Sequence, residues 1–413
     1  MTPDTEIRRC EPDRDREAIL RIWREIGWLG EGKDDEESLD SFLKASTGWV
    51  GELSGSVESL VVTVPGTLRY LDEEIPFSGV AGVTTSRIAR RRGLASRLAA
   101  EAIADGAKQG AKVCGLGMFE QGFYDRLGFG TGPYEVLLTF DPSSLEVPVK
   151  PRVPKRLTAD DWEAVHACRL GRLREHGAVT LEPAELTRAE MLASKNGFGL
   201  GYFDEEGNIT HHIWCSTDDL ESGPYYVRWL AYHNRDELFE LLGLIRDLGD
   251  QVASVRIHEP PEIQLQDLIR KPFRLRQLTR RSKHENRVNA IAYWQVRILD
   301  LAGCLKDTHL RSEVRFNLVL NDPIERFLEE DDGWRGISGE YTITLGPDSA
   351  ASRGKTEGLP ELRASVGAFS RLWLGVRPAS GLAWTDQLSG PSELLTELDR
   401  ALAVPRPSCD WDY

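Results

Sequence analysis

The chain has 413 residues, of which 40% are hydrophobic and 28% charged, a balance typical of a globular protein with several domains and not of a disordered chain. The formal net charge of −15 argues against nucleic-acid binding, because such binding needs a basic surface. No apolar run approaches the length of about 18 residues that a membrane-spanning helix needs. Residues 1–20 are rich in charge and do not resemble a signal peptide. We therefore expect a cytoplasmic protein that binds neither nucleic acid nor a membrane.

The six cysteines and eight histidines show no metal-binding pattern. The cysteines lie far apart in the sequence without a CxxC pair, and no HExxH sequence occurs. His211 and His212 are adjacent, so on a strand they would point to opposite faces. We predict no metal site, and the few scattered cysteines suit a reducing compartment.

Two stretches divide the chain into three parts. Residues 141–155 contain four prolines without hydrophobic periodicity, which predicts an extended linker. A basic polar run over residues 276–287 marks the second break. The predicted domains are residues 1–140, 156–285 and 286–413, with 141–155 as the linker.

The first part predicts alternating helices and strands. Apolar residues at helical spacing indicate helices over 12–28 and 36–45, followed by strands over 48–53, 57–71 and 75–86. A helix over 93–109, a strand over 112–118, a short helix over 122–128 and a strand over 134–140 follow. The order of elements is therefore α-α-β-β-β-α-β-α-β.

A motif that suits a phosphate group lies between the third of these strands and the helix after it. Residues 90–95 read Arg-Arg-Arg-Gly-Leu-Ala, the pattern R-x-x-G-x-A. Backbone N–H groups at a helix N-terminus favour an anion, and a glycine lets the backbone approach it closely. Arg91 and Arg92 add positive charge next to Gly93. The motif predicts a pyrophosphate-binding loop.

This motif and the order of elements resemble the GNAT family of acetyl-CoA-dependent N-acetyltransferases. Residues 122–130, GFYDRLGFG, resemble the Eis (enhanced intracellular survival) segment that carries the general-acid tyrosine. The three-part length, residues 296–301 and 369–388, and the aromatic last residue are similar to the Eis layout. That resemblance implies a mixed α/β fold class: tandem GNAT folds, each a central mixed sheet flanked by helices, then a sterol-carrier-protein-like α+β domain. Residues 119–122 depart from the small-acidic-Gly-Pro sequence that usually precedes the tyrosine.

The resemblance also implies which residues act. Tyr124 would be the general acid, and the α-carboxylate of Tyr413 the general base. The backbone of the third strand would hold the pantetheine arm of acetyl-CoA, and the motif loop its pyrophosphate. The implied cofactor contacts are Val83, Thr84, Thr85, Arg91, Arg92, Gly93, Leu94, Ala95, Ser96, Phe119 and Glu120. The same resemblance implies a homohexamer.

The second part repeats the pattern with a different junction between strand and helix. Residues 232–237 contain no glycine there, and Asp236 and Glu237 stand where phosphates would bind. Carboxylates at a helix N-terminus repel a pyrophosphate, so we expect a degenerate GNAT-like domain without a cofactor.

The predicted function is transfer of an acetyl group from acetyl-CoA to an amine by direct attack on the thioester. The resemblance implies a cationic substrate, either an aminoglycoside-like polyamine or a lysine side chain. Glu25, Glu120, Asp410 and Asp412 are candidates to line an acidic substrate site. Two alternatives stay open: a catalytically inactive GNAT scaffold, and a protein that binds a small apolar ligand or lipid through its C-terminal domain.

Overall fold

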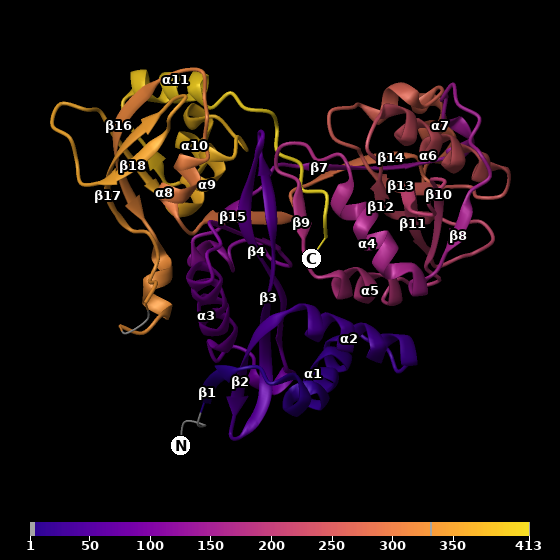
Figure 1. The fold of residues 1–413 in the computed structure, drawn as a ribbon, viewed down its shortest axis with the longest axis horizontal. Coiled ribbons are helices and arrows are strands. Elements are labelled where there is room, and N and C mark those ends of the chain that lie inside the picture. Colours follow the sequence, from indigo (N-terminus) through magenta and orange to yellow (C-terminus); the bar gives the residue numbers. More distant parts are fainter. Residues whose placement is uncertain (1–4, 331–332, 413) are drawn as a thin grey trace.

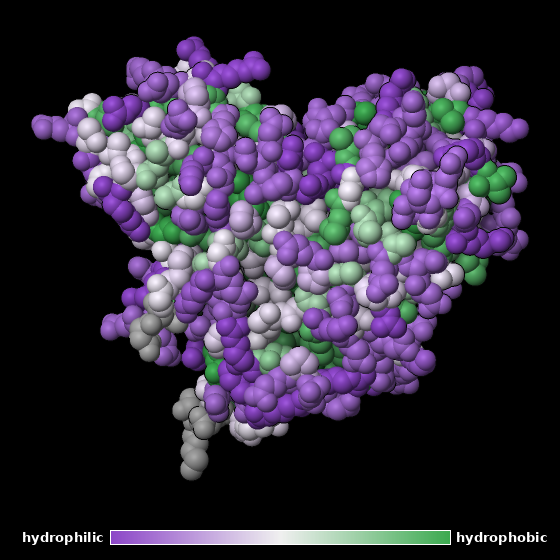
Figure 2. Space-filling model, in the orientation of Figure 1, coloured by the Kyte–Doolittle hydropathy of each residue, from purple (hydrophilic) through white to green (hydrophobic). Residues whose placement is uncertain are grey.

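The computed structural model describes residues 5–330 and 333–412 and contains three sheets. Figure 1 shows them as three units, and we call each sheet with its helices the first, second or third unit in chain order. Figure 2 shows a mostly hydrophilic face whose outline is notched between the second and third units. Within the described residues, no helix has the length and apolarity needed to cross a bilayer.

The first unit is built on an eight-stranded sheet of order β1-β2-β3-β4-β5-β15-β6, with β9 beside β3. Its strands are β1 (Thr5–Arg9), β2 (Thr47–Leu53), β3 (Ser56–Tyr70), β4 (Glu73–Thr85), β5 (Val113–Gly117), β6 (Gly130–Thr131), β9 (Val179–Leu181) and β15 (Trp294–Ile298). Its helices are α1 (Pro12–Ile26), α2 (Lys33–Ala45), α3 (Leu94–Lys108), η1 (Arg87–Ala89) and η2 (Asp125–Leu127).

Strand β1 was not predicted from the sequence. Its residues alternate weakly and are only partly buried, so they show no apolar face. The strand pairs with β2, and Arg8 forms ion pairs with Asp15 and Glu52, both at 2.7 Å. The edge of the sheet is therefore formed by charged groups rather than by an apolar strand.

The second unit is built on a seven-stranded sheet of order β14-β7-β13-β12-β11-β10-β8. Its strands are β7 (Glu135–Phe140), β8 (Lys155–Leu157), β10 (Phe198–Phe203), β11 (Ile209–Thr217), β12 (Tyr225–Ala231), β13 (Val255–His258) and β14 (Arg287–Ile291). Its helices are α4 (Trp162–Gly171), α5 (Ala184–Leu192), α6 (Arg235–Asp247), α7 (Pro272–Thr279), η3 (Pro142–Ser144), η4 (Ala159–Asp161), η5 (Leu248–Asp250) and η6 (Leu265–Leu268).

The third unit is built on a five-stranded sheet of order β18-β17-β16-β19-β20. Its strands are β16 (Val314–Asn321), β17 (Gly339–Leu345), β18 (Ala350–Arg353), β19 (Glu361–Ser365) and β20 (Leu388–Ser389). Its helices are α8 (Leu301–Lys306), α9 (Val366–Trp373), α10 (Ala379–Thr385), α11 (Ser392–Ala401) and η7 (Pro323–Phe327).

Two strands pair with sheets that lie across the domain boundaries predicted from the sequence. The boundaries themselves stay a prediction. Strand β7 lies within residues 1–140 but pairs with β13 and β14 in the second sheet. Strand β15 lies within residues 286–413 but inserts between β5 and β6 of the first sheet. Residues 141–155 pack along the second unit, where Leu145 and Val147 join its core. The three units are therefore joined by shared strands as well as by packing.

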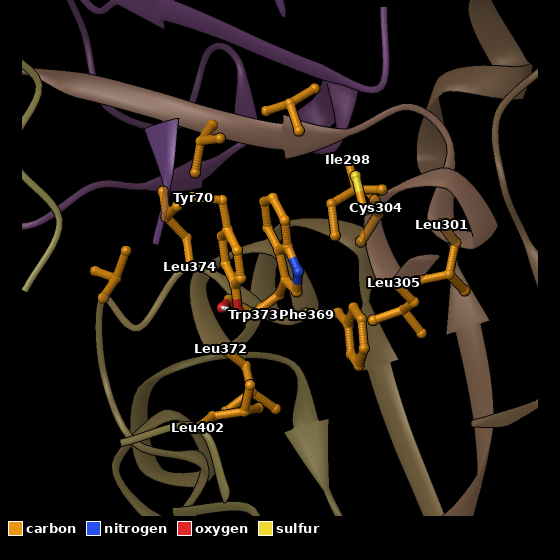
Figure 3. Close-up of a cluster of buried hydrophobic side chains, with 14 of the residues drawn as sticks. Tyr70, Ile298, Leu301, Cys304, Leu305, Phe369, Leu372, Trp373, Leu374 and Leu402 are labelled. Carbon is orange, nitrogen blue, oxygen red and sulfur yellow. Dashed lines mark hydrogen bonds between the residues drawn. The ribbon is translucent and has the colours of Figure 1, made fainter. Parts of the chain in front are cut away.

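A single core joins the first and third units. Every residue of β15 is buried, and Val296 and Ile298 contribute to the same cluster as Phe369 of α9. Figure 3 shows the rings of Tyr70 and Trp373 lying face to face, and their centroids are 4.4 Å apart with planes 5° from parallel. The third unit therefore packs directly against the sheet that carries the candidate site.

Candidate active site

Strands β4 and β5 part at the centre of the first sheet. They pair in parallel only from Phe77–Gly79 to Val113–Gly115. Strand β4 continues to Thr85, whereas β5 ends at Gly117, so six residues of β4 extend beyond the pairing. The backbone groups on this edge of β4 are available to a ligand, because β5 does not pair with them.

A β-bulge lies in the free part of β4. Pairing with β3 passes from Leu60↔Thr84 directly to Val62↔Ala81, so Gly82 and Val83 together face one residue of β3. Gly82 has a φ of +61°, a conformation that glycine adopts without strain. A bulge interrupts the ladder and leaves a residue unpaired. The bulge is therefore located at Val83, the first predicted cofactor contact.

The other two predicted contacts in β4 are held by β3. The Ser59 hydroxyl donates to the Thr84 carbonyl at 2.8 Å and lies 2.9 Å from the Thr85 hydroxyl. These bonds fix the end of β4 just before the motif loop. The loop therefore starts from a defined position.

The motif loop opens helix α3 with an uncapped N-terminus. Gly93 is the N-cap residue, with a φ of +79° and no side-chain cap. A Cβ added at Gly93 would meet no atom within 4 Å, so space is open in front of the first helical amides. Arg91 also has a positive φ, +61°, and it is exposed together with Arg92. This geometry fits a pyrophosphate, which needs free N–H groups, positive charge and close access.

Tyr124 lies in an aromatic shell next to the splayed strands. Its side chain is 1% exposed, and its ring centroid lies 4.8 Å from Phe123, 5.9 Å from Phe119 and 6.2 Å from Phe129. Burial, with a smaller contribution from the nearby Tyr293 phenol, raises the pKa of Tyr124. The phenol therefore holds its proton at neutral pH. The two predicted cofactor contacts that precede Tyr124 in the chain, Phe119 and Glu120, are both exposed on the same loop.

Strand β15 holds the turn that carries Tyr124. The Gln295 amide donates to the Asp125 carboxylate at 2.9 Å. The buried Arg297 guanidinium donates to the Leu127 carbonyl and pairs with Asp322 at 2.6 Å. The sequence shows no signal for these contacts, because the partners are 170 residues apart along the chain.

An acidic cavity of about 330 Å³ begins where β5 ends. It lies between the first unit, the second unit and the C-terminal tail, and Gly117 and Tyr293 form its first-unit side. Trp229 and His258 line it from the second unit. The carboxyl groups in its wall are those of Glu135, Glu259, Glu262, Asp410 and Asp412.

The Asp410 and Asp412 carboxylates of this cavity disfavour the ionisation of Glu135. Burial, and then the Asp412 and Asp410 carboxylates, raise the pKa of Glu135 to about 8. Burial, Asp412 and Glu135 also raise the pKa of Tyr293. A cation bound in the cavity would relieve this repulsion. Arg172, Arg228 and Arg406 line the same cavity, so its wall carries both signs of charge.

The structure brings some of the predicted acidic residues together and separates others. Asp410 and Asp412 line the cavity. The Glu25 carboxylate instead accepts from the Arg87 backbone N–H, in the turn before the motif loop. Glu120 is exposed and is not part of the cavity wall. Tyr413, the predicted base, lies outside the described residues.

Sequence reasoning missed Glu135 and Glu259. Glu135 begins a strand that was assigned to the first domain, and Glu259 follows a strand of the second unit. Their acidity alone gave no reason to separate them from other surface carboxylates. Over residues 5–330 and 333–412, no group of three or more His, Cys, Asp or Glu side chains is placed to hold a metal ion.

The corresponding junction of the second unit is closed by its own side chains. The Asn234 side chain caps α6 by accepting from the Glu237 N–H at 3.0 Å. The Glu237 carboxylate accepts from the His233 N–H at 2.7 Å. This helix N-terminus therefore differs from that of α3, which has no side-chain cap.

Comparisons with known proteins match two parts of the chain to known domain families. Residues 6–132 match the acetyltransferase (GNAT) domain family, and residues 325–410 match the sterol carrier protein domain family. No curated protein matches the chain significantly.

Solved structures share the fold over the whole chain. A conserved protein of unknown function from Enterococcus faecalis V583, a probable N-acyltransferase, has a TM-score of 0.80 and 19% identity over 100% of both chains. A GCN5-related N-acetyltransferase from Kribbella flavida has a TM-score of 0.75 and 16% identity over 100% of this chain and 99% of that one. Eis1 from Mycobacterium abscessus has a TM-score of 0.73 and 15% identity over 99% of this chain and 100% of that one.

The predicted mixed α/β fold class is confirmed. It comprises a GNAT domain with the splayed strands and uncapped helix described above, and a sterol carrier protein domain at the C-terminal end. These features and the family match show that the chain carries a GNAT acetyltransferase domain over residues 6–132.

Proposed function

We propose that this acetyltransferase is Eis-like and transfers the acetyl group of acetyl-CoA to an amine of a cationic substrate, an aminoglycoside-like polyamine or a lysine side chain. The observation that carries the proposal is the acidic cavity that begins at Gly117, where the splayed strand β5 ends. The similarity in fold to Eis1 supports it.

Acetyl-CoA supplies the activated acyl group as a thioester. The free amides of Leu94, Ala95 and Ser96, with the exposed Arg91 and Arg92, would hold its pyrophosphate. Gly93 keeps the approach open, since no atom of the protein fills the space beside it. Further along, Val83, Thr84 and Thr85 would hold the pantetheine arm, and Phe119 and Glu120 would lie near the thioester.

Two groups would stabilise the negative charge that develops during the transfer. The Val83 N–H at the bulge would donate to the thioester oxygen as it gains charge. Tyr124 would protonate the departing thiolate. A free phenol has a pKa of about 10 and a thiol about 8.5, and burial raises the pKa of Tyr124 further, so this transfer must accompany C–S cleavage.

The ammonium of the substrate must lose its proton before it attacks. We assign this step to the α-carboxylate of Tyr413, one residue beyond Asp412 in the cavity wall. A free α-carboxylate has a pKa of about 3.3–3.7, which makes it a weak base in water. Burial next to the other carboxyl groups would raise this value and strengthen the base. We also propose a homohexamer in the cytoplasm, as in the Eis layout.

The test combines binding and turnover. Isothermal titration should show one acetyl-CoA per chain, because one junction is open and the other is capped. A thiol-release assay with an aminoglycoside or a lysine-containing peptide should then show acetyl transfer. Binding without transfer to any amine would favour an inactive scaffold, and tight binding of a lipid without acetyl-CoA would favour the apolar-ligand alternative.

A further inference from the structure

The C-terminal tail forms a wall of the acidic cavity. Figure 1 shows this segment leaving the third unit and running past β9 toward the helices of the second unit. All of residues 406–412 line the cavity. The tail therefore belongs to the site, and the contacts that hold it determine the shape of that site.

A two-point ion pair fixes the tail at Asp410. Its two carboxylate oxygens accept from Nε and Nη2 of Arg172, each at 2.7 Å. The same guanidinium donates to the carbonyls of Arg169 and Val179, also at 2.7 Å each. The Arg172 side chain is 5% exposed, so its plane is set by α4 and β9. Paired N–H···O bonds of this kind specify orientation as well as distance.

The next residue is held by a stacked cation. Trp411 is 3% exposed, and the guanidinium carbon of Arg169 lies 3.7 Å from the centroid of its ring. The other side of Arg169 faces Trp229, at 4.1 Å. The Trp411 indole N–H donates to Glu190 at 3.0 Å. Trp411 is thus buried with its indole N–H hydrogen-bonded, as an anchoring aromatic requires.

The tail backbone also lies close to the loop between α4 and β9 before Asp410. The Ser408 N–H donates to the His176 carbonyl at 2.8 Å. A Cβ at Gly177 would come within 2.5 Å of the Pro407 side chain, and Gly177 has a φ of +86°. A glycine is required there by both the close approach and the backbone conformation.

We propose that the second unit acts as a receptor for the C-terminal tail, and that Arg169 and Arg172 are positioning residues that hold residues 406–412 against the substrate. The proposal rests on the proposed function, in which this cavity takes the amine. In the second unit, Asn234 caps the helix at the junction that corresponds to the motif loop. Arg169 and Arg172 of this region contact the tail. Its part in the reaction is therefore to complete a site in the first unit.

The test uses the full-length chain with Asp410→Asn and Arg172→Gln. Arg174→Gln is the matched control, because Arg174 lies on the same segment but pairs with Glu74 at 2.8 Å. Trimming by a carboxypeptidase, followed by mass spectrometry, reports how often the tail leaves its receptor. Breaking a buried charge pair should speed the removal of Trp411 by about tenfold or more, and the control should match the wild type.

Kinetics provide the second readout. Both tail-releasing variants should lose about tenfold in kcat/KM for the amine, with the acetyl-CoA dissociation constant unchanged. Asp410→Glu, which keeps the charge, should recover most of this loss. If Arg172→Gln does not fold, Asp410→Asn still tests the receptor, because its change is confined to the tail.

The outcomes separate the two proposals. Wild-type trimming of Asp410→Asn would overturn the tail receptor. Faster trimming with unchanged amine kinetics would overturn the positioning role. Faster trimming in a chain whose wild type acetylates no amine would support the receptor and contradict only the proposed function.

Discussion

Arg297 of β15 and Asp322 before η7 form an ion pair of 2.6 Å in which neither side chain is exposed. Asp322 also accepts from the Ile337 N–H at 3.0 Å, and Arg297 donates to the carbonyl of Leu127. The pair therefore connects the third unit to the turn that carries Tyr124. Since a buried charge is costly without its partner, the connection should be sensitive to mutation.

Arg297→Met should destabilise the protein by about 3–5 kcal/mol, because it leaves Asp322 buried and unpaired. Chemical denaturation measures this loss. The matched control is Arg363→Met, which removes an exposed pair with Glu361 and should cost under about 1 kcal/mol. Equal losses in the two variants would show that the buried pair has no special part in stability.

Gly93→Val should fold and lose acetyl-CoA binding by about tenfold or more. The added side chain meets no protein atom, but it occupies the approach to the helix amides and resists the positive φ. Gly110→Val is the control, since Gly110 has a φ of +97° and equally open surroundings beyond the other end of α3. Calorimetry in which both variants bind equally would place the pyrophosphate elsewhere.

Tyr124→Phe should keep acetyl-CoA affinity and lose about 10²–10⁴-fold in kcat, the usual contribution of a general acid. Steady-state kinetics and titration measure the two quantities separately. Tyr202→Phe is the control, because its phenol is also buried but lies in the second unit, outside the cavity wall. A loss below about threefold for Tyr124→Phe would mean that the ring is structural.

The stability of the wild type should fall relative to Glu135→Gln as the pH rises. The folded protein holds the Glu135 proton up to a pKa of about 8, whereas an unfolded chain releases it near about 4.3. Between these values the folded state binds more protons, so raising the pH favours unfolding. Thermal melts should show that the Tm of the wild type, relative to the Tm of Glu135→Gln, is lower at pH 8.5 than at pH 5. A pH-independent difference would contradict the raised pKa.

Removal of Tyr413, or a C-terminal tag, should abolish acetyl transfer while acetyl-CoA still binds. Either change takes the terminal carboxylate from its place, because one residue spans about 3.5 Å of extended chain. Tyr413→Phe keeps that carboxylate and should stay active. Turnover at the wild-type rate after truncation would refute the terminal base.

The motif loop could be predicted from the sequence because its determinants are local. Gly93 supplies the positive φ, and Leu94, Leu98 and Ile103 form the buried side of the helix that follows. The pattern of β7 likewise predicted a strand, since its apolar residues are consecutive in the chain. Which sheet that strand joined was not a local property, and the structure places it in the second unit.

The tertiary structure alone decided how the site is completed. Arg172 meets Asp410 across 238 residues, and Gln295 meets Asp125 across 170. Neither pair has a spacing that a helix or strand would impose, so no periodicity reveals it. The raised pKa of Glu135 depends on burial beside Asp410 and Asp412, which only the folded tail creates. Short-range backbone geometry is encoded in neighbouring residues, whereas desolvation and charge pairing arise only when distant segments pack together.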